Sequence, residues 1–465
     1  MDTWTVLSSH SALYRHAAPG LQEHLLTVQS RLRALFIEHG TLQRIRQAIA
    51  RNQWLPPEGW RALQLEEARG LALHAARRVP YYRDLFGRLG VDPLTWRSLD
   101  DLHALPELSR EDVIEAGTGL LAEGGPLLRF RGSTSGTTGR ALAGWRDRAS
   151  IAFEQAFVER QAAWAGYRPG ERRAWLRGDP VVPAHQAGGA LWRMNRAENT
   201  LLLSSYHLSP ANGAAYIEAL ERFDPVLLQA YPSSVSHLAR WLEEHDRVYQ
   251  GASLRGVVTS SETLSPADRQ LIAERFGCRV FDWYGAFERV AAIGTCEHGN
   301  YHVLEDYGCV EFEPNGDGSA NLIGTGFGNR SMPLLRYRTD DVVVPADPGY
   351  RCPCGRSFRV VERVLGRADD VIRTPDGRHV VMLDWLFTGL FGLLEAQVVQ
   401  ERLNEVRIRI VAGSEFGVAG EQELLARALE RLGPRVTIRI ERVARIERTR
   451  NGKFRQIVSR LSGEQ

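Results

Sequence analysis

The sequence predicts an α/β protein, with a large N-terminal domain of mixed sheets flanked by helices and a small C-terminal α+β domain. Between residues 127 and 344, short apolar runs such as PVLLQAY and LRGVVTS alternate with helical stretches such as PADRQLIAERFG, a pattern typical of α/β folds. After Gly366 the pattern changes: VRIRIV and RVTIRIERV alternate with the period of a strand and enclose the helical stretch EQELLARALERLG. A chain of 465 residues is long enough for both domains.

The spacing of apolar residues predicts a helical N-terminal segment over residues 1–100. Leu63 to Ala76 carries apolar residues at near-helical spacing, and we expect a turn at VPYYRDLF, residues 79–86. The change of pattern after LGRADD places the domain boundary at Asp369. We therefore predict an N-terminal domain over 1–368 and a C-terminal domain over 369–465.

Composition and charge exclude several classes of protein. Lys and Arg number 58 against 56 Asp and Glu, which leaves a net charge of +2 and no sign of a nucleic-acid partner. No stretch approaches the roughly 18 apolar residues that a membrane span requires. The start, MDTWTVLSSHSALYRH, lacks a signal-peptide pattern, so we expect a cytoplasmic protein whose five cysteines do not form disulfides.

Lys453 is the one lysine of the chain, since every other Lys or Arg position is an arginine. Lysine offers a compact point charge and arginine a planar fork of donors, so the two differ chemically. We interpret Lys453 as a position that requires an ammonium group. The alternative is that Lys453 is a solvent-exposed lysine retained by chance, without a functional role.

A hydroxyl-rich run follows LLRFRG and reads Ser133-Thr134-Ser135-Gly136-Thr137-Thr138-Gly139-Arg140. Glycines let backbone N–H groups approach a ligand, and hydroxyls add donors, so the run suits a phosphate group. Its glycine spacing is not that of a Walker A loop. The alternative is a flexible surface loop.

This run resembles the phosphate loop of the adenylate-forming superfamily, which includes acyl-CoA ligases, luciferases and nonribosomal adenylation domains. Further segments resemble that superfamily's motifs in the same order: YGAFE at 284–288, YRTDD at 337–341, GRADD at 366–370 and NGK at 451–453. ARRVPYYRDLF, LDDLHALPELSREDV and TSSETL narrow the resemblance to the phenylacetate-CoA ligase-like and CapK-like branch. The resemblance covers residues 75–454 and implies the adenylate-forming enzyme fold with a mobile C-terminal domain.

The resemblance also implies catalytic roles. Lys453 is the catalytic lysine, Glu288 the Mg²⁺ ligand, and Arg140 stands in the phosphate loop where lysine is usual. Asp369 is the hinge about which the small domain rotates.

The resemblance also implies which residues of these motifs bind ATP. Tyr284 would stack on adenine, Asp282 would accept from its amino group, Asp341 would bind the ribose hydroxyls, and Arg367 would add a donor. The implied nucleotide-binding residues are Ser133, Thr134, Ser135, Gly136, Thr137, Thr138, Gly139, Asp282, Tyr284, Gly285, Asp341 and Arg367. Asp340 stands where the family has glycine, so the choice between Asp340 and Asp341 stays open.

The acyl pocket is implied beside the YGAFE strand and a preceding aromatic segment. Its expected residues are Tyr231, Ser233, Ser260, Trp283, Ala286 and Phe287. Aromatic residues with few charges predict an apolar or aryl acid. The alternative for Trp283 and Phe287 is an ordinary core position.

Two cysteine-containing segments predict a structural zinc site. Cys296-Glu297-His298 and Cys352-Pro353-Cys354 supply three thiolates and an imidazole, the number that a closed tetrahedral site takes. The predicted ligands are Cys296, His298, Cys352 and Cys354. The alternative is that cysteines fill the core, as we expect for Cys278 and Cys309.

These interpretations predict an ATP-dependent, AMP-forming ligase that converts a small carboxylic acid to an acyl-adenylate and passes the acyl group to coenzyme A. The expected cofactors are ATP, Mg²⁺, structural Zn²⁺ and coenzyme A as acceptor. An amine or the phosphopantetheine of a carrier protein is an alternative acceptor, and a nucleotide- and zinc-binding scaffold without turnover is an alternative of another class. The oligomeric state stays open, with a dimer as one candidate.

Overall fold

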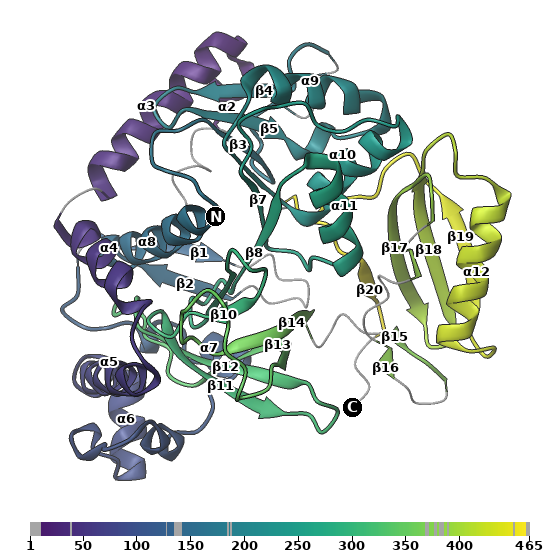
Figure 1. Cartoon of the computed structure of the whole chain (residues 1–465). Helices are drawn as coiled ribbons and strands as arrows, with labels where there is room; N and C mark the ends of the chain where they lie inside the picture. Colours follow the sequence, from purple (N-terminus) through teal and green to yellow (C-terminus); the bar gives the residue numbers. More distant parts are fainter. Residues whose placement is uncertain are drawn as a thin grey trace. The chain divides into compact units, whose positions relative to one another are not determined.

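The computed structural model describes residues 11–37, 40–126, 128–133, 142–183, 186, 188–367, 372–375, 379–380, 386–387, 390–449 and 452–461 (Figure 1). Contacts divide the chain into two compact units. The first comprises Met1–Tyr14, His24–Arg168 and Phe281–Val364, and the second Arg15–Glu23, Pro169–Val280 and Leu365–Gln465.

The described part of the N-terminal segment is helical, as predicted. Its helices are α2 (Ala12–His16), α3 (Pro19–Ile37), α4 (Gly40–Asn52), α5 (Pro57–Arg78), α6 (Pro80–Leu89), η1 (Pro93–Thr95) and η2 (Leu99–Ala104). The turn expected at 79–86 is wrong, because residues 80–86 lie in α6 and Val79 directly precedes it. Pro80 occupies the first helical turn and Gly90 ends the helix in the left-handed conformation, while Tyr82 and Phe86 are buried.

The first unit contains a sheet in the order β11-β12-β13-β14-β10-β9-β8, in which the pairs β11–β12, β12–β13, β14–β10, β10–β9 and β9–β8 are antiparallel. Its strands are β8 (Arg279–Gly285), β9 (Ala292–Thr295), β10 (Tyr301–Val303), β11 (Gly308–Pro314), β12 (Ala320–Gly326), β13 (Tyr337–Pro345) and β14 (Val360–Arg367). The remaining elements of this unit are α7 (Arg110–Ala116), η3 (Gly117–Leu120), the hairpin β1 (Phe130–Ser133) and β2 (Ala143–Arg146), and α8 (Arg148–Trp164). This sheet carries the YGAFE and YRTDD motifs at the ends of β8 and in β13.

The second unit contains a sheet in the order β7-β6-β3-β5-β4, parallel except for β4. Its elements are β3 (Arg173–Arg177), β4 (Trp192–Asn195), β5 (Thr200–Ser204), η4 (Ser205–His207), η5 (Pro210–Asn212), α9 (Gly213–Phe223), β6 (Leu227–Ala230), α10 (Pro232–Glu244), β7 (Gly256–Ser260) and α11 (Pro266–Phe276). Because parallel strands present their carboxyl ends at one edge, Arg177, Ser204, Ala230 and Ser260 share that edge, where α/β proteins usually bind ligands.

The C-terminal segment has a small sheet of its own, in the order β19-β18-β17-β20, and α12 packs against it (Figure 1). Its elements are β15 (Ile372–Arg373), β16 (His379–Val380), β17 (Leu393–Arg402), β18 (Glu405–Ala412), α12 (Val418–Leu432), β19 (Thr437–Arg442) and β20 (Ile457–Ser459). Buried Ile408, Leu424 and Ala428 belong to a separate core. The predicted strand, helix and strand are confirmed as β18, α12 and β19. Asp369 lies outside the described residues, so the boundary there stays a prediction.

In the part of the chain that the structure describes, no helix combines the length and the apolar character that crossing a membrane requires.

Candidate active site

Tyr284 and Asp341 join two of the sequence motifs in the first unit. The Tyr284 phenol donates to Oδ2 of Asp341 over 2.7 Å. Burial raises the pKa of Tyr284 well above its ordinary value, and the Asp341 carboxylate raises it further. The phenol therefore stays protonated and donates to an ionised carboxylate, which is a strong, charge-assisted hydrogen bond.

Glu288 is held by Tyr337, the first residue of β13. The Tyr337 hydroxyl donates to Oε1 of Glu288 over 3.0 Å. Burial, followed by the nearby Glu288 charge, raises the pKa of Tyr337, so this hydroxyl also remains a donor. The contact fixes one oxygen of a partly buried carboxylate. A carboxylate oxygen held in this way suits a hard cation such as Mg²⁺.

Asp340 has a φ of +60°, in the left-handed region that glycine adopts freely. This is the backbone conformation expected where the family has glycine, and aspartate is among the side chains that tolerate it best. Of the two neighbouring carboxylates, it is Asp341 that accepts from Tyr284.

Asp282 is buried in β8, and its carboxylate already has a donor. The Tyr301 hydroxyl donates to Oδ2 of Asp282 over 2.9 Å, while the Asp282 backbone N–H donates to Thr295 Oγ1 over 2.6 Å. Trp283 lies opposite Gly294 in the β8–β9 ladder and packs partly buried against an apolar cluster. Gly285 ends β8.

Phe287 packs against the hairpin that flanks the hydroxyl-rich run. A Cβ at Gly132 or Gly144 would lie 3.2 or 3.0 Å from the Phe287 ring. The Arg146 guanidinium lies 4.3 Å from the ring centroid and donates to the Phe287 carbonyl over 2.5 Å. Phe287, predicted as a pocket residue, thus supports this hairpin, and Ala286 precedes it in the same turn.

Part of the predicted phosphate loop falls outside the described residues. Ser133 pairs with Ala143 as the last residue of β1. The residues beyond it that lie outside the description are Thr134, Ser135, Gly136, Thr137, Thr138, Gly139 and Arg140. Arg367 is described as the last residue of β14.

The predicted pocket residues of the second unit lie at the carboxyl edge of its parallel sheet. Tyr231 follows β6 and is buried, with the Arg177 guanidinium 5.1 Å from its ring centroid. Ser260 ends β7 and is also buried. Ser233, in the first turn of α10, donates its backbone N–H to Oε2 of Glu262 over 3.0 Å.

Lys453 lies in a compact turn of the same unit. The Thr449 N–H donates to the Lys453 carbonyl over 2.9 Å, and the Lys453 N–H donates to Thr449 Oγ1 over 3.0 Å. Gly452 has a φ of +71°, and a Cβ there would lie 2.6 Å from the Gly178 Cα atom. The lysine turn therefore packs directly after β3, at the edge that carries Tyr231 and Ser260.

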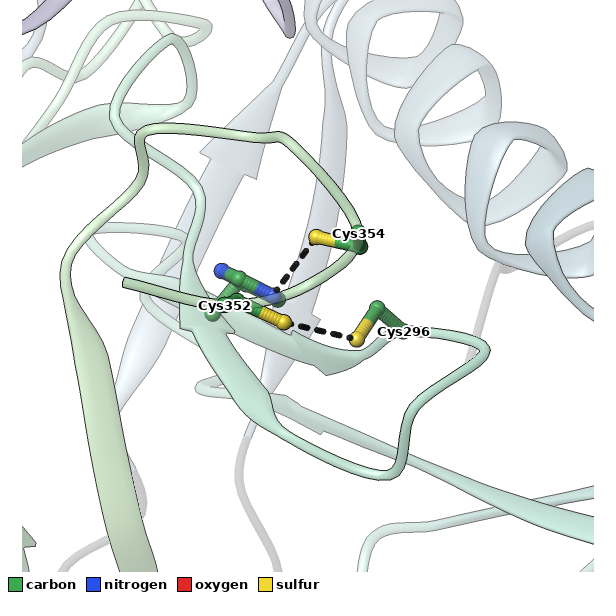
Figure 2. Close-up of side chains that lie close together, drawn as sticks. Cys296, Cys352 and Cys354 are labelled. Atoms are coloured by element: carbon green, nitrogen blue, oxygen red, sulfur yellow. Dashed lines mark hydrogen bonds between the residues drawn. The ribbon is translucent and has the colours of Figure 1, made fainter. Parts of the chain in front are cut away.

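Three cysteines and a histidine form a compact cluster in the first unit (Figure 2). The ligand atoms of Cys296, His302, Cys352 and Cys354 lie within 4.8 Å of one another. The Sγ atoms of Cys296 and Cys352 are 3.6 Å apart, and Cys354 Sγ is 3.4 Å from His302 Nε2. Zn–S bonds of about 2.3 Å in a tetrahedron separate two sulfurs by about 3.8 Å, so the spacing fits zinc.

His302, not the predicted His298, completes this cluster. His302 lies in β10 opposite Gly294 of β9 and is buried, whereas His298 is exposed in the turn between the two strands. The His298 backbone N–H, rather than its ring, donates to Cys296 Sγ over 3.4 Å. His298 is the histidine nearest to Cys296 in the sequence, but His302 is the one whose side chain is buried in a strand.

The surroundings of the cluster suit thiolates. Asn300 Nδ2 donates to Cys352 Sγ over 3.2 Å, alongside the His298 N–H at Cys296. Burial raises the pKa of the Cys296 thiol to about 12, so this group ionises only beside a positive charge. A metal ion supplies such a charge, and the donor set of three sulfurs and one imidazole is one that zinc takes.

Comparisons with known proteins agree with the motifs. Residues 372–460 match the family model of the CapK C-terminal domain. Protein CapK of Staphylococcus aureus is 23% identical over 367 residues, which cover 78% of this chain and 81% of CapK. A phenylacetate-coenzyme A ligase of Thermus thermophilus is 28% identical over 330 residues, covering 68% of this chain and 72% of the relative. The chain is a homologue of CapK and of the phenylacetate-CoA ligases. The resemblance predicted from the motifs is confirmed.

Solved structures establish the fold of this CapK homologue. A 2-hydroxyisobutyryl-CoA ligase in the postadenylation state aligns with a TM-score of 0.67 at 19% identity, covering 89% of this chain and 92% of that one. The same ligase in the thioesterification state aligns with a TM-score of 0.54. The predicted adenylate-forming fold is therefore confirmed.

Three residues of the candidate site were missed by sequence reasoning. Tyr337 opens the YRTDD motif, yet no pattern in the sequence pairs it with Glu288. His302 could have been found from the strand period of NYHV, which turns alternate residues inward. Glu262, in TSSETL, has no local signal, because its partners lie far away in the sequence.

Proposed function

We propose that this protein is an ATP-dependent, AMP-forming acyl-CoA ligase that activates an apolar or aryl carboxylic acid. The observation that carries the proposal is the pairing of motif residues, Tyr284 with Asp341 and Tyr337 with Glu288. Each pair orients a carboxylate that adenylation would use, one for the ribose and one for a cation. Homology to proteins named phenylacetate-coenzyme A ligase supports the same reaction class.

In the nucleotide half of the reaction, Asp341 would accept from the ribose hydroxyls while Tyr284 keeps its carboxylate oriented. Tyr284 would at the same time offer a flat ring to the adenine. Glu288, fixed by Tyr337, would hold Mg²⁺. That ion, when bound, neutralises charge on the phosphates. The hydroxyl-rich run from Ser133 to Arg140 would donate to the phosphate oxygens.

Lys453 would stabilise the negative charge that develops between the acid's carboxylate and the α-phosphate as pyrophosphate leaves. The position of its turn at the end of β3, near Tyr231 and Ser260, supports this role because the acid would bind among those side chains. The second half-reaction, attack of a thiol on the acyl-adenylate, would follow rotation about Asp369.

We further propose that Cys296, His302, Cys352 and Cys354 hold a structural zinc ion. Four protein ligands leave no open coordination position, so the ion would join β9, β10 and the segment before β14 without acting on substrate. The cysteines are free thiols rather than disulfides, which supports a cytoplasmic location.

Pyrophosphate release across a panel of acids would test the proposal. Purified protein is mixed with ATP, Mg²⁺ and one acid at a time, beginning with phenylacetate and benzoate. We expect acid-dependent pyrophosphate release, and mass analysis with CoA present should find an acyl-CoA. An acyl-amide or an acylated carrier protein instead would favour the alternative acceptors. If no acid in a broad panel released pyrophosphate, the protein would be a binding scaffold and the proposal would fail.

A further inference from the structure

Glu262 joins the lysine turn to the first turn of α10. Its Oε1 atom accepts from the backbone N–H of Phe454, in a short hydrogen bond, and its Oε2 atom accepts from the Ser233 N–H over 3.0 Å. The two donors, Ser233 and Phe454, are 221 positions apart in the sequence. Phe454 directly follows Lys453, so the bond acts on the backbone that carries the catalytic ammonium.

We propose that Glu262 is a positioning residue that clamps the lysine turn to the acyl-binding edge during adenylation. The inference rests on the proposed function, in which Ser233 belongs to the acyl pocket and Lys453 to the reaction centre. Both oxygens of one carboxylate are used, one for each segment. The clamp therefore fixes the catalytic turn relative to the residue where the acid would lie.

A carboxylate is needed for this geometry because both partners are backbone donors. A carboxylate presents two acceptors, whereas the amide of glutamine presents one acceptor and one donor. With Gln at this position, one backbone N–H would face an NH₂ group and lose its partner. Burial raises the pKa of Glu262, and the Phe454 N–H, Arg448 and the Ser233 N–H oppose that rise.

Further contacts hold the described residues of the turn. Arg448 pairs with Glu395 of β17 and lies 4.8 Å from the Phe454 ring centroid. Within the turn, the Gly452 N–H donates to the Thr449 carbonyl over 2.7 Å. Because the turn is closed by its own hydrogen bonds, holding Phe454 also holds Lys453.

The test compares E262Q with a matched control, E244Q. Glu244 is the last residue of α10, and its carboxylate also accepts two hydrogen bonds from a distant segment. The donors are the Ser414 N–H, over 2.8 Å, and the Ser414 hydroxyl, over 2.9 Å. That contact reaches the segment between β18 and α12 and does not involve the described residues of the lysine turn. Both of these donors reach the same oxygen, Oε1, so the amide oxygen of E244Q can still accept them. Both variants therefore remove one carboxylate charge, and only E262Q loses the clamp.

Three readouts are measured for each variant: the kcat and KM of acid-dependent pyrophosphate release, thioester formation from synthetic acyl-adenylate and CoA, and Tm. We expect E262Q to lower the kcat of adenylation by roughly 10- to 100-fold, since small misplacements of a catalytic group have effects of that size. The KM for ATP and for the acid, and the rate of thioester formation, should change little. E244Q should behave as the wild type.

Lys453 also allows a test that needs no turnover. It is the only lysine in the sequence, so an amine-reactive acetylating reagent reports on its side chain, with the N-terminal amine as internal reference. In E262Q we expect faster acetylation of Lys453 than in the wild type or E244Q. E262D, which keeps the charge but shortens the reach, should lie between them.

Equal adenylation and equal labelling in E262Q and the wild type would overturn the inference. So would a parallel fall of both half-reactions in step with Tm, since that pattern marks a structural role. Absence of acid-dependent pyrophosphate release in the wild type is a different result, and it would reject the proposed function. Acetylation rates would then still decide whether Glu262 clamps the turn.

Discussion

Tyr284 and Asp341, 57 positions apart in the sequence, are joined by a 2.7 Å hydrogen bond from phenol to carboxylate. The bond couples the residue proposed to face the adenine with the residue proposed to hold the ribose. Since the Tyr284 pKa is raised by burial and by Asp341 itself, the bond persists throughout the neutral pH range. The two motifs therefore behave as one preorganised unit rather than as separate contacts.

Asp341→Asn should raise the KM for ATP by about 10- to 100-fold, which corresponds to the roughly 1.5–3 kcal/mol of a hydrogen bond to a charged group. The amide keeps the shape and can still accept from Tyr284, but it presents a single acceptor to the two ribose hydroxyls. The kcat should change less. The measurement is pyrophosphate release as a function of ATP concentration.

Asp340→Asn is the matched control for that variant. Asparagine tolerates the left-handed backbone at this position as well as aspartate does, so the turn is preserved. We expect a KM for ATP near that of the wild type. A larger effect for Asp340→Asn than for Asp341→Asn would reverse the assignment of the two carboxylates.

Much of the fold could be predicted because its signals are local. The alternation in VRIRIV identified β18, and the 3.6-residue period of the following stretch identified α12. Residues 79–86 show a local signal that was misinterpreted: Pro and two Tyr residues were taken to indicate a turn, yet Pro80 is a helix-start residue and Gly90 a helix-end residue, with Tyr82 and Phe86 at helical spacing between them.

His302→Ala should abolish stoichiometric zinc binding, whereas His298→Ala should retain it. A site filled at about 1,000 times its Kd contributes about 4 kcal/mol to stability, so His302→Ala should also lower Tm. Elemental analysis and thermal unfolding with and without chelator provide the measurements. Zinc in the His302→Ala protein at the wild-type level, or a wild-type protein indifferent to chelator, would contradict the zinc proposal.

The candidate site was less predictable than the fold. Motif resemblance named Glu288 and Asp341, but their partners depend on which strands become neighbours. Tyr337 reaches Glu288 and Tyr301 reaches Asp282 only through the order of strands in the sheet. Contacts of this kind carry no spacing signal in a single sequence.

Alkaline unfolding should begin near pH 10. Burial raises the pKa of Tyr82, Tyr216 and Tyr249, and it raises the pKa of the Cys278 thiol to about 12. A group whose pKa is raised by folding stabilises the protein below its unfolded pKa, about 10 for Tyr and 8.5 for Cys, and this contribution is lost as the pH rises further. Phenolate absorbance and circular dichroism should therefore change together. Phenolate formation by these tyrosines while the circular dichroism stays native would contradict the burial argument.

Lys453→Arg tests whether the reaction needs an ammonium group rather than a positive charge alone. Arginine retains the charge, but its planar fork cannot present donors from one compact centre. We expect both Lys453→Arg and Lys453→Ala to lower the kcat of adenylation by on the order of 100- to 1,000-fold, the effect of removing one donor to a developing oxyanion. Thioester formation from a preformed acyl-adenylate should be spared, because that half-reaction would not use Lys453. Near-normal adenylation by Lys453→Arg would show that a positive charge suffices at this position. The presence of lysine rather than arginine at 453 would then not be explained by the chemistry of the reaction. Equal loss of both half-reactions in Lys453→Ala would refute the division of labour between them.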